Sequence, residues 1–86
     1  MVYTILLSPQ AEKFLSKLDA SVVYRVRDKL RELGTNPRLG KPMTANLAGF
    51  WCLRTWKVRF LYTIQDTQLL VLVMDIDYRG KIYHKR

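Results

Sequence analysis

The sequence predicts an α+β fold: one domain in which a small antiparallel sheet carries an N-terminal helical hairpin on one face. Three observations predict it. Apolar residues recur at helical spacing over residues 9–18 and 20–33, and then at strand spacing from residue 47 onward. Only one long loop, residues 35–46, separates these two patterns. A chain of 86 residues is long enough for a single core, so we expect one domain over residues 1–86.

The first strand is predicted over residues 2–7, which are apolar and rich in β-branched side chains. Ser8 and Pro9 follow, a combination that fits a helix N-cap with proline at the first helical position. Phe14 and Leu18 then lie four residues apart, with apolar neighbours, which predicts a short amphipathic helix.

A second helix is expected to begin after Asp19, taken as its N-cap, and to end at Gly34, with Pro37 beyond it. Its apolar face is formed by Val22, Val23, Val26, Leu30 and Leu33. The short connection between the two helices leaves room only for a helical hairpin.

Three apolar segments with a period of two follow the loop: LAGFWCLRT, VRFLYTIQ and QLLVLVMDI. The gaps between them are short, which favours antiparallel hairpins. The last segment is apolar at nearly every position, as is typical of a central strand covered on both faces. The predicted order is therefore β-α-α-β-β-β.

The register of the first of these hairpins follows from a turn at Trp56 and Lys57, which pairs Arg54 with Arg59. A similar turn in the second hairpin would place Met74 beside Arg59. The face expected to lie under the helices carries Trp51, Leu53, Phe60, Tyr62, Leu69, Val71 and Val73.

The two arginines then lie side by side on the opposite face, where like charges directly opposite each other are destabilising. Two interpretations are open at this point: a solvated pair, or a pair bridged by an anion. Arginine suits the second, because its planar fork binds phosphate bidentately and stays charged.

The composition narrows the function classes. A net charge of +8 indicates a polyanionic partner, such as nucleic acid, an anionic membrane surface or an acidic protein. The chain has one cysteine, Cys52, and one histidine, His84, so we expect no disulfide framework, no metal site and no cofactor. No apolar run approaches the length that spans a bilayer, and we expect a protein of the reducing cytoplasm without a membrane partner.

The last twelve residues, DIDYRGKIYHKR, interleave cations with tyrosines, which is unusual for a disordered basic tail. We expect them to be held in place and aimed at something negatively charged. Further cations expected to bind it are Lys57, Lys81, Lys85 and Arg86, and the resemblance given next implies that it is RNA and that the segment completes a phosphate-binding site.

Nearly the whole chain resembles the RelE/ParE toxin superfamily of toxin–antitoxin modules. The most specific motifs are Leu47-x-Gly49-x-Trp51-x-Leu53-Arg54, Val58-Arg59-x-Leu61-Tyr62 and Arg79-x-x-x-Tyr83. This resemblance implies a RelE-like fold and, for RelE-type members, cleavage of messenger RNA in the ribosomal A site. It also implies three partners: the ribosome, messenger RNA and a cognate antitoxin, which we expect to be acidic and partly disordered when free.

The resemblance also implies roles for particular residues. Arg59 would stabilise the scissile phosphate, Arg79 would stabilise the leaving group or act as the acid, and Tyr83 would stack on or orient the base and ribose. Arg54 falls where the family often has a proposed base, but arginine is a poor base, so we expect Arg54 to clamp phosphate. A basic residue often found two positions earlier is replaced by Cys52.

Two alternatives to RNA cleavage remain at the level of sequence. ParE-type members share the fold but inhibit DNA gyrase without cutting RNA. A weakly active RNA-binding homologue is the second alternative. The combination of Arg59, Arg79 and Tyr83 favours the endoribonuclease.

Overall fold

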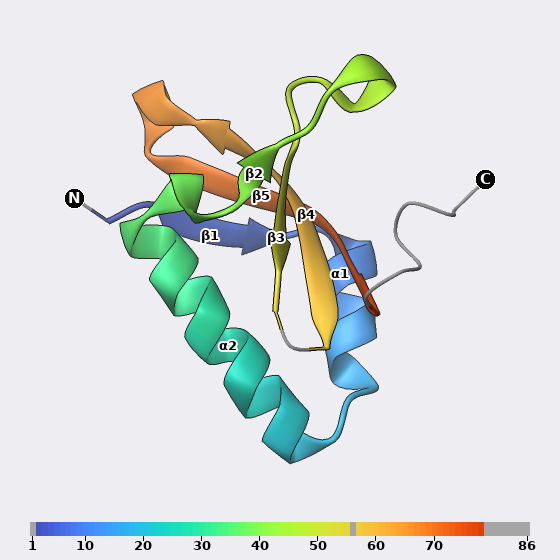
Figure 1. Cartoon of the computed structure of the whole chain (residues 1–86). Coiled ribbons are helices and arrows are strands. Elements are labelled where there is room, and N and C mark those ends of the chain that lie inside the picture. The colour runs from blue at the N-terminus through green and yellow to red at the C-terminus, as the bar shows by residue number, and fades with distance from the viewer. Residues whose placement is uncertain (1, 56, 79–86) are drawn as a thin grey trace.

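The computed structural model describes residues 2–55 and 57–78 and confirms the predicted α+β class (Figure 1). Its elements are β1 (Thr4–Leu7), α1 (Pro9–Ser16), α2 (Ala20–Thr35), β2 (Lys41–Pro42), β3 (Trp51–Arg54), β4 (Val58–Gln65) and β5 (Leu70–Tyr78). Short 3₁₀ turns occupy residues 37–39, 45–47 and 66–68. Within the described ranges, neither helix has the length and apolar character needed to cross a membrane.

The sheet has the strand order β1-β5-β4-β3-β2 and is mixed rather than wholly antiparallel. The last strand, β5, is central, as its apolar sequence predicts. The neighbour of β5 on the far side, β1, runs parallel to it, with Thr4 opposite Leu70 and Leu7 opposite Val73. Hairpin reasoning could not give this direction, because β1 and β5 lie at opposite ends of the chain and no short turn joins them.

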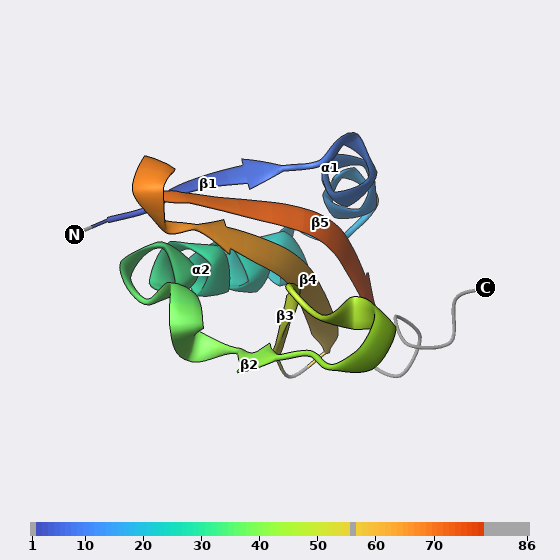
Figure 2. The same ribbon diagram turned by 90° about the horizontal axis from the view of Figure 1, so that it is seen from above.

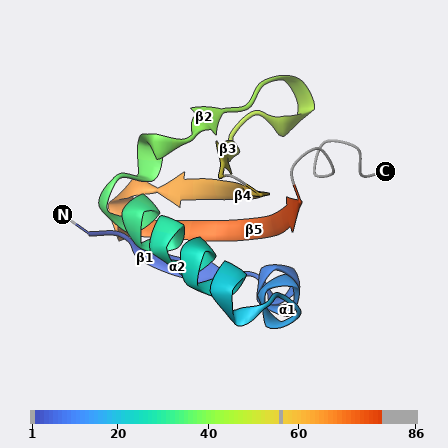
Figure 3. The same ribbon diagram turned by 60° about the horizontal axis from the view of Figure 1, so that its bottom comes forward.

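Both helices lie on one face of the sheet. In Figure 3 α2 crosses in front of the strands and α1 lies beside its beginning, and in Figure 2 α2 passes beneath the sheet. The core between helices and sheet consists of Ala11, Leu15, Val26, Leu30, Leu33, Leu53, Val58, Phe60, Tyr62, Val71, Val73 and Ile76. Most of the predicted inner face is therefore buried. Trp51 is only half-buried, and Leu69 belongs instead to the turn before β5.

The start of α1 is as predicted. Pro9 is its first residue, and the Ser8 Oγ accepts a hydrogen bond of 3.0 Å from the backbone N–H of Ala11. The same hydroxyl donates to the carbonyl of Met74 at 2.7 Å. The cap thus also attaches the beginning of α1 to β5.

The end of α2 differs from the prediction. Asp19 is the N-cap residue but makes no side-chain capping bond, and the helix runs past Gly34 to Thr35. Gly34 is buried within the last turn, where its carbonyl accepts a 2.7 Å hydrogen bond from the N–H of Tyr3. A side chain there would begin only 3.2 Å from the Tyr3 carbonyl oxygen. The glycine therefore permits close helix–strand approach and does not end the helix.

Of the two predicted hairpin registers, the structure confirms the first and contradicts the second. Between β3 and β4, Arg54 lies opposite Arg59 as predicted. Between β4 and β5, Arg59 lies opposite Asp77, not Met74, so that prediction is wrong. The turn is longer than two residues, with Leu69 in the left-handed conformation at φ 51°, and a bulge shifts the pairing between Leu61 and Tyr62.

The segment predicted as a free loop is attached to the sheet by Tyr62. This side chain is fully buried, and its hydroxyl donates to the Pro37 carbonyl at 2.7 Å and accepts from the Gly40 N–H at 3.1 Å. Gly40 comes so close to β3 that an added Cβ would lie 2.6 Å from the Cys52 carbonyl oxygen. The attachment lets the next two residues form β2 at the sheet edge.

A second attachment is made on the surface by Asp66. Arg38 donates to both its carboxylate oxygens, at 3.2 and 2.8 Å, and the Tyr3 hydroxyl donates to one of them. These hydrogen bonds, first from Arg38 and then from Tyr3, hold the pKa of Asp66 below its ordinary value of 3.8. A lowered pKa means that the stabilisation is present above that value and is lost as the pH falls through the folded-state pKa. The Arg38 guanidinium also lies over the ring of Trp51, 5.9 Å from its centroid.

Replacing Tyr62 with phenylalanine tests the buried attachment. Tyr62→Phe leaves the Pro37 carbonyl without its donor and the Gly40 N–H without its acceptor, which is expected to cost about 1–3 kcal/mol of unfolding free energy. Urea unfolding at neutral pH measures it. Burial raises the pKa of the Tyr62 hydroxyl above its ordinary value of 10.0, so this difference should be lost as the pH rises through the folded-state pKa.

The matched control is Tyr24→Phe, because that side chain on α2 is 69% exposed. Its stability should stay within about 0.5 kcal/mol of the wild-type value. Equal stabilities for all three proteins would show that the hydroxyl of Tyr62 does not hold the loop.

Candidate functional site

A hollow of about 400 Å³ lies between the β2 segment and the strands β3 and β4. Its lining residues are Leu39, Gly40, Lys41, Pro42, Met43, Cys52, Leu53, Arg54 and Arg59. One side of the hollow is thus formed by residues 39–43, around β2, and the other by residues of β3 and β4. In Figure 1 the connection from β2 to β3 rises on the side of the sheet opposite α2.

Strand pairing explains why the charged side chains gather there. Directly opposite residues share a face, and the register pairs Lys41 with Cys52 and Arg54 with Arg59. Cys52 and Arg54 are two apart on β3, so they also share that face. Three adjacent strands thus supply one cation each to the same hollow.

The electrostatics of the hollow are dominated by these cations. Arg54 is exposed and Arg59 is half-buried. On the other side of Arg59, the cross-strand residue on β5 is Asp77, whose carboxylate accepts a 2.8 Å hydrogen bond from the Tyr78 N–H. A row of two arginines and one aspartate therefore crosses β3, β4 and β5, and Asp77 partly offsets the repulsion within the arginine pair.

Cys52 forms part of the floor. Its thiol side chain is 5% exposed, and the residue forms no disulfide. It supplies no positive charge to the hollow, as its residue type implies. Among residues 2–55 and 57–78, no group of three or more histidine, cysteine, aspartate or glutamate side chains could hold a metal ion.

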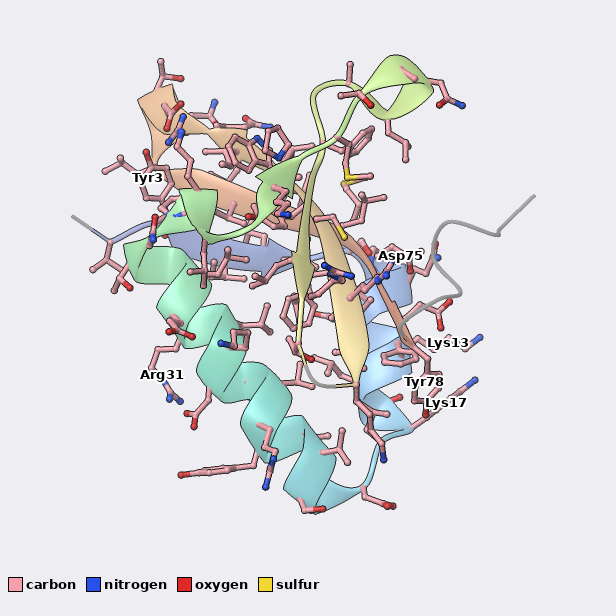
Figure 4. The ribbon with its side chains drawn as sticks, viewed as in Figure 1. Tyr3, Lys13, Lys17, Arg31, Asp75 and Tyr78 are labelled. Carbon is pink, nitrogen blue, oxygen red and sulfur yellow. The ribbon has the colours of Figure 1, made fainter. Side chains whose placement is uncertain are left out.

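Lys57, one of the predicted RNA-binding cations, lies in a different place. It lines a smaller hollow of about 150 Å³ that Lys17 and Tyr78 also line, near the end of β5. Lys13 and Lys17 both project from α1 on the side where Tyr78 lies (Figure 4). Tyr78 packs edge-on against Phe14, with ring centroids 5.2 Å apart.

The C-terminal site residues Arg79, Lys81, Tyr83, Lys85 and Arg86 lie outside the described residues, as does His84. Their roles stay predictions. The structure therefore tests the juxtaposition of Arg54 and Arg59, which it confirms, and the placement of Lys57, which it separates from that pair.

Two residues near the arginine pair were missed from sequence. Lys41 falls in the segment predicted as a long loop, although the flanking Gly40 and Pro42 are residues that occur at a tight sheet edge. Asp77 differs from the predicted neighbour of Arg59 because the turn before β5 is longer than two residues and a bulge in β5 shifts the pairing further.

Comparisons with known proteins agree on a family. Residues 5–83 match the family model of the ParE toxin of type II toxin–antitoxin systems, parDE. The chain is 32% identical to Toxin RelG of Mycobacterium tuberculosis over 87 residues, covering 99% of this chain and all of that protein.

Solved structures give the same picture. The toxin–antitoxin complex RelBE2 of Mycobacterium tuberculosis contains a chain that is 30% identical and superposes with a TM-score of 0.86, covering 93% of this chain and 94% of that one. A chain of the intact E. coli RelBE complex, at 24% identity, shares the fold with a TM-score of 0.71 over 86% of this chain and 93% of that one.

Proposed function

Because the chain belongs to the ParE toxin family of type II toxin–antitoxin systems, within the RelE/ParE superfamily, we propose that it inhibits translation as a ribosome-dependent endoribonuclease that cleaves messenger RNA in the A site. The observation that carries the proposal is the hollow containing the paired Arg54 and Arg59. A concave cationic site on rigid strands suits a phosphodiester better than a flat protein surface.

The proposed reaction is internal transesterification of the RNA. The 2′-oxygen forms a bond to the adjacent phosphorus and loses its proton, while the bond to the 5′-oxygen breaks and that oxygen takes up a proton. The products carry a 2′,3′-cyclic phosphate and a free 5′-hydroxyl. Arg59, half-buried and held on the central part of the sheet, would stabilise the extra negative charge of the phosphorane.

Arg54 would hold the same phosphate from β3. Arginine stays protonated at neutral pH, so neither member of the pair is suited to accept the 2′-proton. We propose that the ribosome supplies what the chain lacks, by orienting the 2′-hydroxyl in line with the leaving oxygen. Orientation alone removes a large part of the barrier in such reactions.

The C-terminal segment would complete the site. Residues 79–86 follow directly after Tyr78 at the end of β5, and Asp77 on that strand lies opposite Arg59. We propose that Arg79 stabilises the leaving oxygen and that Tyr83 stacks on a base. The cations Lys57, Lys81, Lys85 and Arg86 would bind the RNA backbone without reading its sequence.

Inhibition of DNA gyrase is the second candidate, and the match to the ParE family model favours it. That activity needs a protein-binding surface and no phosphodiester site. Expression in growing cells, followed by mapping of messenger RNA ends, separates the two. Cuts within translated codons would support the endoribonuclease, whereas intact messages with arrested replication would support gyrase inhibition.

The proposed partner that neutralises the toxin is an acidic antitoxin, partly disordered when free. On the sheet face opposite the helices, Leu61, Leu70 and Leu72 are half-buried and Met74 is 36% exposed. A segment that folds across this face would bury these side chains, while acidic residues would meet the net charge of +8.

The first functional prediction concerns Arg59. Arg59→Ala should lower the rate of messenger RNA cleavage on the ribosome by about 10²–10³-fold, because one preorganised contact to transition-state charge is lost. Arg79→Ala should have a similar effect. Cleavage is measured by the appearance of new RNA ends in a reconstituted translation reaction.

The control is Arg31→Ala, which removes the same charge from an exposed side chain on α2 that projects away from the sheet (Figure 4). It should cleave at the wild-type rate. Full activity in both Arg59→Ala and Arg79→Ala would show that the cationic hollow is not the catalytic site.

The second functional prediction concerns the substrate. Purified protein should cut naked RNA far more slowly than RNA on the ribosome, because the chain offers the arginine pair but no well-suited base in the described hollow. Parallel time courses with and without ribosomes measure the ratio. Rapid cleavage without ribosomes would contradict the proposed role of the ribosome and would favour His84 as the base.

A further inference from the structure

Lys41 lines the cationic hollow, although the sequence predicts only a loop for its segment. Its cross-strand partner is Cys52, and both line the hollow together with Arg54 and Arg59. We infer that Lys41 binds the RNA phosphate next to the one held by the arginine pair. This inference rests on the proposed endoribonuclease function and assigns the hollow a second phosphate position.

The backbone around Lys41 is fixed on both sides. Before it, the Gly40 N–H donates to the buried Tyr62 hydroxyl, and the absence of a side chain lets Gly40 approach the Cys52 carbonyl. After it, Pro42 restricts the chain, and the Met43 N–H donates to the Phe50 carbonyl at 2.9 Å. A binding residue whose backbone is already ordered loses less conformational freedom when it meets its ligand.

The geometry points to a separate phosphate. Arg54 and Arg59 are direct cross-strand neighbours, whose Cβ atoms lie about 4.5–5.5 Å apart in such pairs and can grip one phosphate together. Lys41 is diagonal to Arg54 across β2 and β3, and diagonal neighbours lie about 7–8 Å apart. The flexible stem of lysine carries a compact charge with three donors, which suits a phosphate whose position is less strictly defined.

The surrounding hollow supports this arrangement. Cys52, which is buried, lies directly opposite Lys41 and two residues before Arg54 on β3, and it is not a cationic residue. The cations therefore form two groups, one lysine and two arginines, separated by a position without a basic side chain. Two consecutive phosphates of one RNA strand match two such groups better than a single phosphate does.

The test compares two RNA ligands that cannot be cleaved because every 2′-hydroxyl is methylated. A dinucleotide has one phosphodiester and a tetranucleotide has three. Binding to the purified full chain is followed by chemical-shift titration for the dinucleotide and by fluorescence anisotropy for the tetranucleotide. Lys41→Ala should lower the affinity for the tetranucleotide by about tenfold and leave the affinity for the dinucleotide unchanged. The slope of log K against log salt should fall by about 0.7 for the tetranucleotide, the loss of one single-strand phosphate contact.

Lys13→Ala is the matched control, because it removes the same charge from an exposed position on α1 (Figure 4). Lys41→Arg should retain tetranucleotide binding, and all variants should unfold at the wild-type temperature. Equal affinities of Lys41→Ala and Lys13→Ala for the tetranucleotide would overturn the inference. An equal loss on both ligands would also overturn it, because Lys41 would then act at the same phosphate as the arginines.

Arg59→Ala in the same titrations separates this inference from the proposed function. If Arg59→Ala weakens the binding of both ligands and Lys41→Ala weakens the binding of neither, only the second phosphate position is wrong. If Arg59→Ala leaves the binding of both ligands unchanged, the hollow is not the RNA site, and the proposed function fails with it.

Discussion

The buried hydroxyl of Tyr62 is the interaction on which the candidate site depends. The ring fills the core between the sheet and the helices, while the hydroxyl reaches the loop after α2 and satisfies the Pro37 carbonyl and the Gly40 N–H. A buried phenol without partners would be costly, so core and loop constrain each other. This attachment holds Gly40 against Cys52, directly before β2, whose residues Lys41 and Pro42 line the hollow.

The sheet separates two requirements that conflict in so small a protein. One face packs the hydrophobic core beneath α1 and α2, which provides the stability. The other face is left to carry cations, and Arg54 and Arg59 can remain adjacent there because Asp77 lies beside one of them and solvent reaches the other. Under the proposed function, the repulsion within the pair would be a local cost of binding an anion, which the core on the opposite face offsets.

The net charge of +8 is consistent with a sheet that buries its core on one face and carries cations on the other. Such a charge attracts a polyanion over distances comparable to the Debye length, whereas the proposed role of the hollow is to set where a phosphate binds. The same field would attract an acidic antitoxin, so substrate and inhibitor would share an electrostatic preference. Under the proposed function, apolar side chains on the outer face, including Leu72 and Met74, would contact the antitoxin and not the RNA.

Local rules determined much of this protein from the sequence alone. Ser8 and Pro9 placed the start of α1, period-two alternation identified the strands, and a short turn fixed the register that pairs Arg54 with Arg59. Each depends on residues close in the chain. Only the tertiary structure decided the parallel pairing of β1 with β5, the close helix–strand contact at Gly34, the longer turn and bulge that bring Asp77 opposite Arg59, and the place of Lys41. These depend on contacts between segments far apart in sequence, whose geometry is set by the packing of the whole domain and not by the preferences of any single segment.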